Sequence, residues 1–154
     1  MAWDGRARAC EQLRVLVAHL GAHPALVMVS VDPVSVLADG LCLVHAGYGL
    51  ACARAWVRSL GAETVTVQLV SRWREMSDRA RAVLTVERAP LRVEVMFGQD
   101  DTWALAVGLG LRFGDARGAT VSEVSACLGA VQRLVADRGL PGDVGGRLGG
   151  AVGV

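Results

Sequence analysis

The sequence predicts an α+β domain: a mostly antiparallel sheet, made of a hairpin and a four-strand meander, covered by about three helices. Residues 91–97 read Leu-Arg-Val-Glu-Val-Met-Phe, an alternation that a sheet with one buried side requires. The stretch from 63 to 114 continues as strand-like runs separated by turn residues, with helix-like spacing before and after it. The expected element order is therefore α-β-β-α-β-β-β-β-α.

The length and composition fit one globular domain. A chain of 154 residues, 53% hydrophobic and 20% charged, is large enough to bury a core without a metal or disulfide staple. We expect the single domain to cover residues 1–141. Residues 142–154 are rich in glycine and are expected to form a flexible C-terminal tail.

The charge balance argues against a nucleic-acid partner and against a membrane surface. The formal net charge is +1, which gives no long-range attraction to polyanions. All 16 cationic residues are Arg, and this usage, with abundant Ala, Gly and Val, indicates a high-GC source such as an actinobacterium or one of its phages. Arg is thus the available cation here, so its presence says little about phosphate recognition.

The four cysteines predict a cytoplasmic protein with reduced thiols. They are scattered without a CxxC pair, and the chain begins Met-Ala-Trp-Asp without a basic-then-apolar leader. The longest apolar run, 103–111, is shorter than the about 20 residues that a membrane-spanning helix needs. No motif calls for a cofactor or a metal.

Three segments have helical spacing and helix-end signals. The first runs from Asp4 to Gly21, and its predicted buried stripe is Cys10, Leu13, Leu16, Val17 and Leu20. The second covers 48–60 with Gly61 as C-cap, and its stripe is Leu50, Ala53, Val57 and Leu60. The third begins at a Thr120-to-Glu123 capping box.

The strand-like runs fall into two groups. Residues 25–31 and 41–45 are expected to form a hairpin. The meander is expected to consist of Glu63–Ser71, Arg81–Glu87, Leu91–Phe97 and Trp103–Phe113, with turns at 89–90 and 99–102. One side of the last run carries Ala104, Ala106, Gly108 and Gly110, which predicts close approach by a helix.

The order of the first five elements, with the helix that ends at Gly61, resembles small proteins of actinobacteria and their phages. The resemblance extends over roughly residues 11–97 and rests on pattern. It implies no activity.

One candidate ligand site follows the second strand of the hairpin. Gly47-Tyr48-Gly49 lies between a strand and a helix start, where backbone N–H groups can hold an anion. We predict His45, Tyr48, Gly49 and Arg54 as its ligand-binding residues. The full dinucleotide pattern is missing, because Cys52 stands where a third Gly is needed.

Other residue types that could carry chemistry have weaker contexts. Cys42 or Cys52 near His45 would allow a thiol–imidazole pair, but nothing in the sequence orders it. His19 and His23 have the spacing of a helical metal pair, but Gly21 and Pro24 end the helix between them. The adjacent acids at 100–101 are interpreted as turn residues.

The connection at 72–80 is the candidate contact segment. Arg and Trp can stack on nucleic-acid bases, but acidic residues interrupt the run, and Trp, Arg and Met are also enriched at protein interfaces. The predicted partner-contact residues are Arg72, Trp73, Arg74, Met76 and Arg79.

Two hypotheses on function remain. The favoured one is a non-catalytic interaction or assembly protein, acting through a protein partner or self-association. The alternative is a small-molecule or anion-binding domain, and potentially an enzyme, that uses the Gly47–Gly49 turn.

Overall fold

The computed structural model describes residues 2–32, 40–71 and 80–138. Within these ranges the elements are, in chain order, α1 (Ala2–Ala22), β1 (Ser30–Asp32), β2 (Cys42–Tyr48), α3 (Leu50–Leu60), β3 (Thr64–Ser71), β4 (Ala80–Arg88), β5 (Leu91–Met96), α4 (Gln99–Leu109), β6 (Ala116–Thr120) and α5 (Val121–Arg138). The predicted tail and the predicted partner-contact residues Arg72, Trp73, Arg74, Met76 and Arg79 lie outside the described residues.

All six strands form one mixed sheet, in the order β1-β2-β5-β4-β3-β6. β2 pairs with β5 in parallel, and every other neighbouring pair is antiparallel. The α+β class and the mostly antiparallel sheet are therefore confirmed. The hairpin and the meander belong to one continuous sheet, and the described chain contains four helices where about three were predicted.

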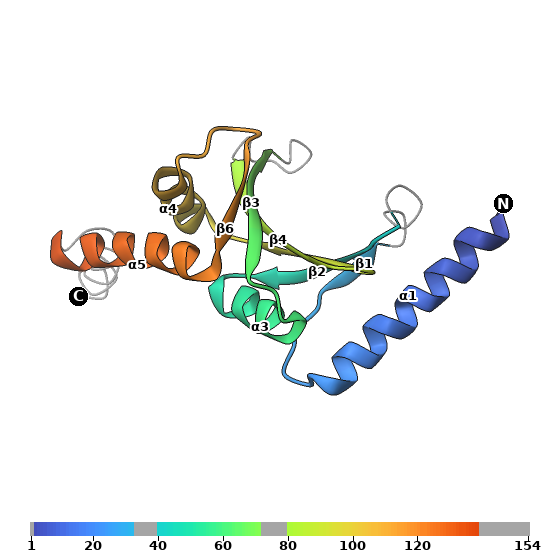
Figure 1. The fold of residues 1–154 in the computed structure, drawn as a ribbon. Coiled ribbons are helices and arrows are strands. Elements are labelled where there is room, and N and C mark those ends of the chain that lie inside the picture. The colour runs from blue at the N-terminus through green and yellow to red at the C-terminus, as the bar shows by residue number, and fades with distance from the viewer. Residues whose placement is uncertain (1, 33–39, 72–79, 139–154) are drawn as a thin grey trace, which may run out of the picture.

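The strands have one face toward the helices and one face away from them. Leu91, Val93 and Val95 of β5 are buried under the helical layer, whereas Arg92 and Glu94 point to the opposite face and are half-buried. Helices α3, α4 and α5 gather on the first face (Figure 1). The alternation in residues 91–97 thus reports the two sides of the sheet correctly.

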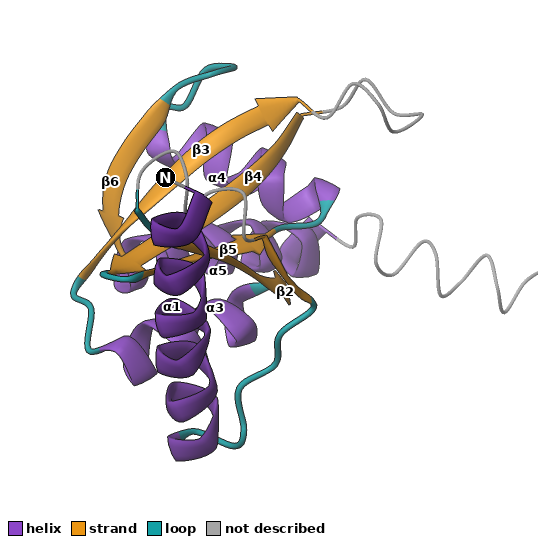
Figure 2. Ribbon diagram, turned by 90° about the vertical axis from the view of Figure 1, so that its right-hand side faces the viewer, coloured by secondary structure: helices purple, strands orange, loops and turns teal. Residues whose placement is uncertain are grey.

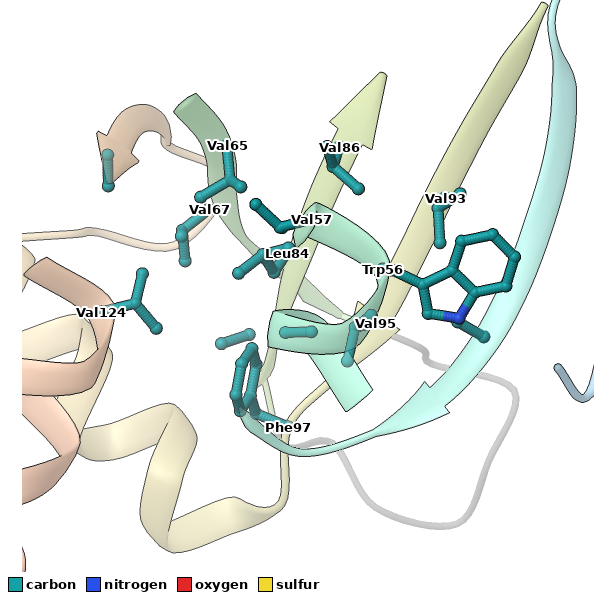
Figure 3. Packing of buried hydrophobic residues seen from close by; sticks show 14 of the residues in the cluster. Trp56, Val57, Val65, Val67, Leu84, Val86, Val93, Val95, Phe97 and Val124 are labelled. Atoms are coloured by element: carbon teal, nitrogen blue, oxygen red, sulfur yellow. The ribbon is translucent and has the colours of Figure 1, made fainter. Parts of the chain in front are cut away.

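The hydrophobic core lies between the sheet and these helices (Figure 3). Its largest member is Trp56 of α3, which is fully buried, with its indole Nε1–H donating to the carbonyl of Val27 at 2.9 Å. Phe97, at the end of β5, and Val124 of α5 are also fully buried. The core therefore joins the hairpin half of the sheet to the meander half.

Helix α3 confirms its predicted stripe and its predicted end. Ala53, Val57 and Leu60 are buried, and Gly61 adopts the left-handed conformation with φ 63°. The Gly61 N–H donates to the Arg58 carbonyl, which satisfies a backbone group that the helix end would otherwise leave unpaired.

The predicted strand at Trp103–Phe113 is wrong, because residues 99–109 form helix α4. The spacing of Leu105 and Leu109 fits one side of a helix as well as one side of a strand, and both side chains are buried. The predicted turn at 99–102 is the first turn of α4, where Asp100 and Asp101 lie near the positive end of the helix dipole. Gly110, in the left-handed conformation, ends the helix.

The sixth strand is instead β6, which the sequence pattern does not predict. Its residues, Ala-Arg-Gly-Ala-Thr, are small or charged and have no apolar alternation. It pairs antiparallel with β3, which places it at the edge of the sheet.

Helix α1 forms as predicted, but its predicted buried stripe is only partly right. Leu16 is buried and Leu20 is half-buried. The remaining members of the stripe, Cys10, Leu13 and Val17, are exposed. The helix is turned so that Gln12, which is buried, donates from its side chain to the carbonyl of Gly40. The polar side chain of Gln12 thus faces the protein, whereas Cys10, Leu13 and Val17 of the predicted stripe do not.

Helix α5 begins at the predicted capping box. The Glu123 N–H donates to Thr120 Oγ1 at 3.2 Å, and the Thr120 N–H donates to Glu123 Oε2 at 3.4 Å. The predicted close approach at a glycine also occurs, although between two helices. A Cβ atom added at Gly108 of α4 would lie 2.5 Å from Cys127 Sγ and 2.9 Å from Cys127 Cβ.

We predict that Gly108→Ala destabilises the protein by about 1–3 kcal/mol, because the added methyl group overpacks the contact between α4 and α5. This loss exceeds the gain in helix propensity of at most about 1 kcal/mol. Thermal or denaturant unfolding measures the change. Gly118→Ala, where the added atom meets open space, is the matched control. A Gly108→Ala variant at least as stable as the wild type would contradict the packing.

Candidate functional site

Two of the predicted ligand-binding residues, His45 and Tyr48, line one surface depression of about 220 Å³. It lies where the parallel strands β2 and β5 end. Its lining residues are Val29, Ser30, His45, Gly47, Tyr48, Glu94 and Met96.

Parallel pairing places an acid beside the predicted histidine. His45 and Glu94 are register partners, and His45 Nδ1 lies 3.7 Å from Glu94 Oε2. Both side chains are partly exposed, so a ligand could reach them. Glu94 was not predicted as a site residue, because no local pattern shows which strand lies beside β2.

Gly47 and Gly49 determine the backbone conformation of the turn between β2 and α3. The register of β2 shifts between His45 and Gly47, and Gly47 has φ 140°. Gly49 has φ 91° and is the N-cap of α3, while its N–H donates to the Met96 carbonyl at 2.9 Å. That N–H is therefore occupied within the protein. With a carboxylate, an imidazole and a phenol around it, the depression suits a neutral or cationic ligand better than an anion.

Arg54, the fourth predicted residue, lies at a different place. It is exposed on α3 and donates from Nη2 to Ser125 Oγ of α5 at 2.6 Å. It lines a separate open hollow of about 430 Å³ between α3 and α5, together with Val121, Ser122, Ser125, Ala126, Gly129 and Arg133. The structure thus brings His45 and Tyr48 together and leaves Arg54 outside their group.

Cys42 and His45 do not form a thiol–imidazole pair. Cys42 is buried on the helical side of β2, and His45, an odd number of residues away, points to the other side of the sheet. Burial raises the pKa of the Cys42 thiol, with a further contribution from Asp32, and burial raises the pKa of Cys52. Both thiols are thus held in the less nucleophilic protonated form.

His19, in the last turn of α1, has a structural role. His19 Nε2 lies 2.9 Å from Ser59 Oγ, and its ring stacks on Trp56 with centroids 5.8 Å apart. The Ser59 hydroxyl donates to the Trp56 carbonyl, so it accepts from His19. Within the described ranges, no group of three or more His, Cys, Asp or Glu side chains is arranged to hold a metal ion.

Exposed apolar side chains gather in two regions. The first combines α1 with the segment that leads to β1, and its members are Leu13, Val15, Val17, Val27, Met28 and Val29. The second lies at α4 and the connection that follows it. There Trp103 and Val107 are each 62% exposed and Phe113 is 65% exposed. These residues had been assigned to a strand and were not predicted as contact residues.

The region at α4 is continuous with a hollow of about 420 Å³, lined by Leu69, Ala80, Gln99, Asp100, Thr102, Trp103 and Ala106. The Gly114 N–H donates to the Leu69 carbonyl at 3.1 Å, which holds the connection carrying Phe113 to the end of β3. Trp103 and Phe113 therefore lie at the same end of the molecule.

No protein family, curated protein or solved structure matches this chain. Among the described helices, none has the length and apolar character needed to cross a membrane.

The environment of His19 predicts a pH-dependent stability. Burial, followed by the charges of His23 and Arg88, lowers the pKa of His19 from the usual 6.5. The unfolded chain therefore takes up a proton at a higher pH than the folded chain does. The free energy of unfolding should decrease as the pH falls below about 6.5, until His19 also protonates in the folded state.

Denaturant unfolding between about pH 7.5 and pH 5 measures this dependence. His19→Gln should reduce the change of the unfolding free energy with pH. Arg14→Gln, which removes an exposed charge from the same helix, should leave that change as it is in the wild type. An unchanged pH dependence in His19→Gln would show that His19 is not responsible.

Proposed function

We propose that this protein acts without catalysis, by binding a protein partner through the outward side of α4 and the connection that follows it. The contact surface consists of Trp103, Val107 and Phe113 and is called the α4 surface below. The proposal rests chiefly on one observation: after its polar first turn α4 carries only apolar residues, from Trp103 to Leu109, yet the side with Trp103 and Val107 is exposed.

The other sides of α4 pack against the rest of the domain. Thr102, Leu105 and Leu109 are buried in the domain, and Gly108 contacts Cys127 of α5. A helix that is apolar all round is typical of a fully buried position. The exposed side of α4 is therefore suited to burial against another molecule.

The composition of the α4 surface also fits a protein interface. Trp is the residue type most enriched among binding hot spots, and Phe is enriched at interfaces. Asp100 and Arg112, both exposed, lie beside the apolar residues and supply a polar rim. The four cysteines are free thiols, which supports a reducing cytoplasm as the place of action, and the exclusive use of Arg supports a high-GC actinobacterial or phage source.

We expect Trp103→Gln and Val107→Gln to weaken partner binding by about 10-fold to 100-fold without unfolding the domain, because both side chains are exposed. The partner is first identified by quantitative affinity purification from the source organism. Its Kd is then measured by titration calorimetry with purified components.

Val17→Gln is the matched control, since Val17 is an equally exposed apolar residue on α1. Equal losses in all three variants would show that general hydrophobicity, and not the α4 surface, drives binding. Unchanged binding in the α4 variants would contradict the proposal.

A second candidate function is the binding of a small polar molecule in the depression at His45, Tyr48 and Glu94. His45 and Glu94 face each other across the parallel strands, so two partly exposed hydrogen-bonding groups converge in the depression. This convergence favours a small-molecule site. Neutral or cationic molecules are the expected class, since Glu94 supplies a carboxylate.

A thermal-shift screen with neutral and cationic metabolites tests this candidate. A ligand should raise Tm by a few degrees, and His45→Gln or Glu94→Gln should abolish that shift. Tyr48→Phe should reduce it, while Arg54→Gln, in the separate hollow, should leave it unchanged. A screen without hits, or a shift that persists in the His45 and Glu94 variants, excludes the site.

A further inference from the structure

Strand β6 is the last strand on its side of the sheet. Within the described ranges it pairs only with β3, and Figure 2 shows it at the margin of the molecule with no described element beyond it. Its outer edge is therefore open to another strand.

The register with β3 shows which backbone groups point to this edge. The Leu69 N–H donates to the Asp115 carbonyl, which marks that pair as hydrogen-bonded. Because such pairs alternate in an antiparallel ladder, Val67 with Arg117 and Val65 with Ala119 are hydrogen-bonded too. The pairs made by Ala116 and Gly118 are then the non-hydrogen-bonded ones.

The N–H and C=O groups of Ala116 and Gly118 consequently point away from β3. The Thr120 N–H, two residues further on, agrees with this alternation, since it donates to Glu123 instead of β3. No hydrogen bond within the described part of the chain occupies the outward groups of Ala116 or Gly118.

The side chains of β6 leave this edge accessible. Ala116 and Gly118 are small, and a Cβ atom at Gly118 would meet open space. The one charged side chain, Arg117, turns inward and donates to the Leu109 carbonyl at 2.6 Å. Protected edges usually carry a Pro, a bulge or an outward charge, and β6 has none of these among its residues.

We propose that a second copy of this chain pairs its own β6 antiparallel with this edge, joining the two sheets across a two-fold axis. The proposal rests on the contact function proposed above but concerns a different surface. Ala116 of each copy lies opposite Gly118 of the other, so that the two copies exchange four hydrogen bonds. All the outward groups of Ala116 and Gly118 are satisfied in this register.

Self-pairing fits this edge, because a two-fold axis at Arg117 places the open position Ala116 of each copy opposite the open position Gly118 of the other. The guanidinium of each Arg117 is held at Leu109 of its own copy, which keeps the two like charges apart. With a net charge of +1, two copies repel each other little.

Light scattering over a range of concentrations, together with amide hydrogen exchange, tests the proposal. The wild type should form a dimer, and exchange at Ala116 and Gly118 should slow as the concentration rises. The amides of Arg117 and Ala119 face β3 and should be protected at every concentration. This alternation would identify β6 as the interface.

Gly118→Pro should raise the dimer Kd at least about tenfold, because it removes an outward donor in each copy. It leaves the bonds to β3 in place. Gly118→Ala keeps the donor and should dimerise like the wild type. A monomeric wild type, a Gly118→Pro dimer of unchanged Kd, or exchange at Ala116 and Gly118 that ignores concentration would each overturn the proposal. The α4 surface would still be tested separately by the Trp103 and Val107 variants.

Discussion

The parallel pairing of β2 with β5 is the interaction on which the rest of the structure depends. It joins the hairpin to the meander, and its two ends are fixed by Cys42 N–H donating to Pro90 and Gly49 N–H donating to Met96. Because α3 follows β2 directly, this pairing also lays Trp56 over the meander, where it completes the core. The depression at His45 exists for the same reason, since its two halves come from the two strands.

Local signals predicted much of the fold. The alternation in residues 91–97, the Gly61 cap and the Thr120-to-Glu123 capping box each describe an interaction between residues close in sequence, and each is present. The parallel pair could not be predicted in this way, because it joins residues about 50 positions apart and leaves no periodic trace in either strand. Segment 103–113 was misassigned because apolar residues on nearly all sides fit a strand and a helix alike.

The candidate sites, too, combine features that local sequence predicts with features that depend on long-range packing. His45 and Tyr48 were predicted from the glycines between them, which is local information, but Glu94 and the separate position of Arg54 depend on strand order and helix packing. The exposed side of α4 was hidden by the strand assignment, and the exposed side of α1 by the expectation that its apolar stripe faces the core. Once the core around Trp56 is complete, these apolar residues remain uncovered, and those at α4 are the basis of the contact function proposed here.

Backbone nuclear Overhauser contacts between β2 and β5 test the central structural claim most directly. The account predicts contacts that advance in the same direction along both strands, from Cys42 with Leu91, through Val44 with Val93, to Tyr48 with Met96. Contacts that run in opposite directions, or no contacts between these strands, would contradict the joined sheet and the depression built on it.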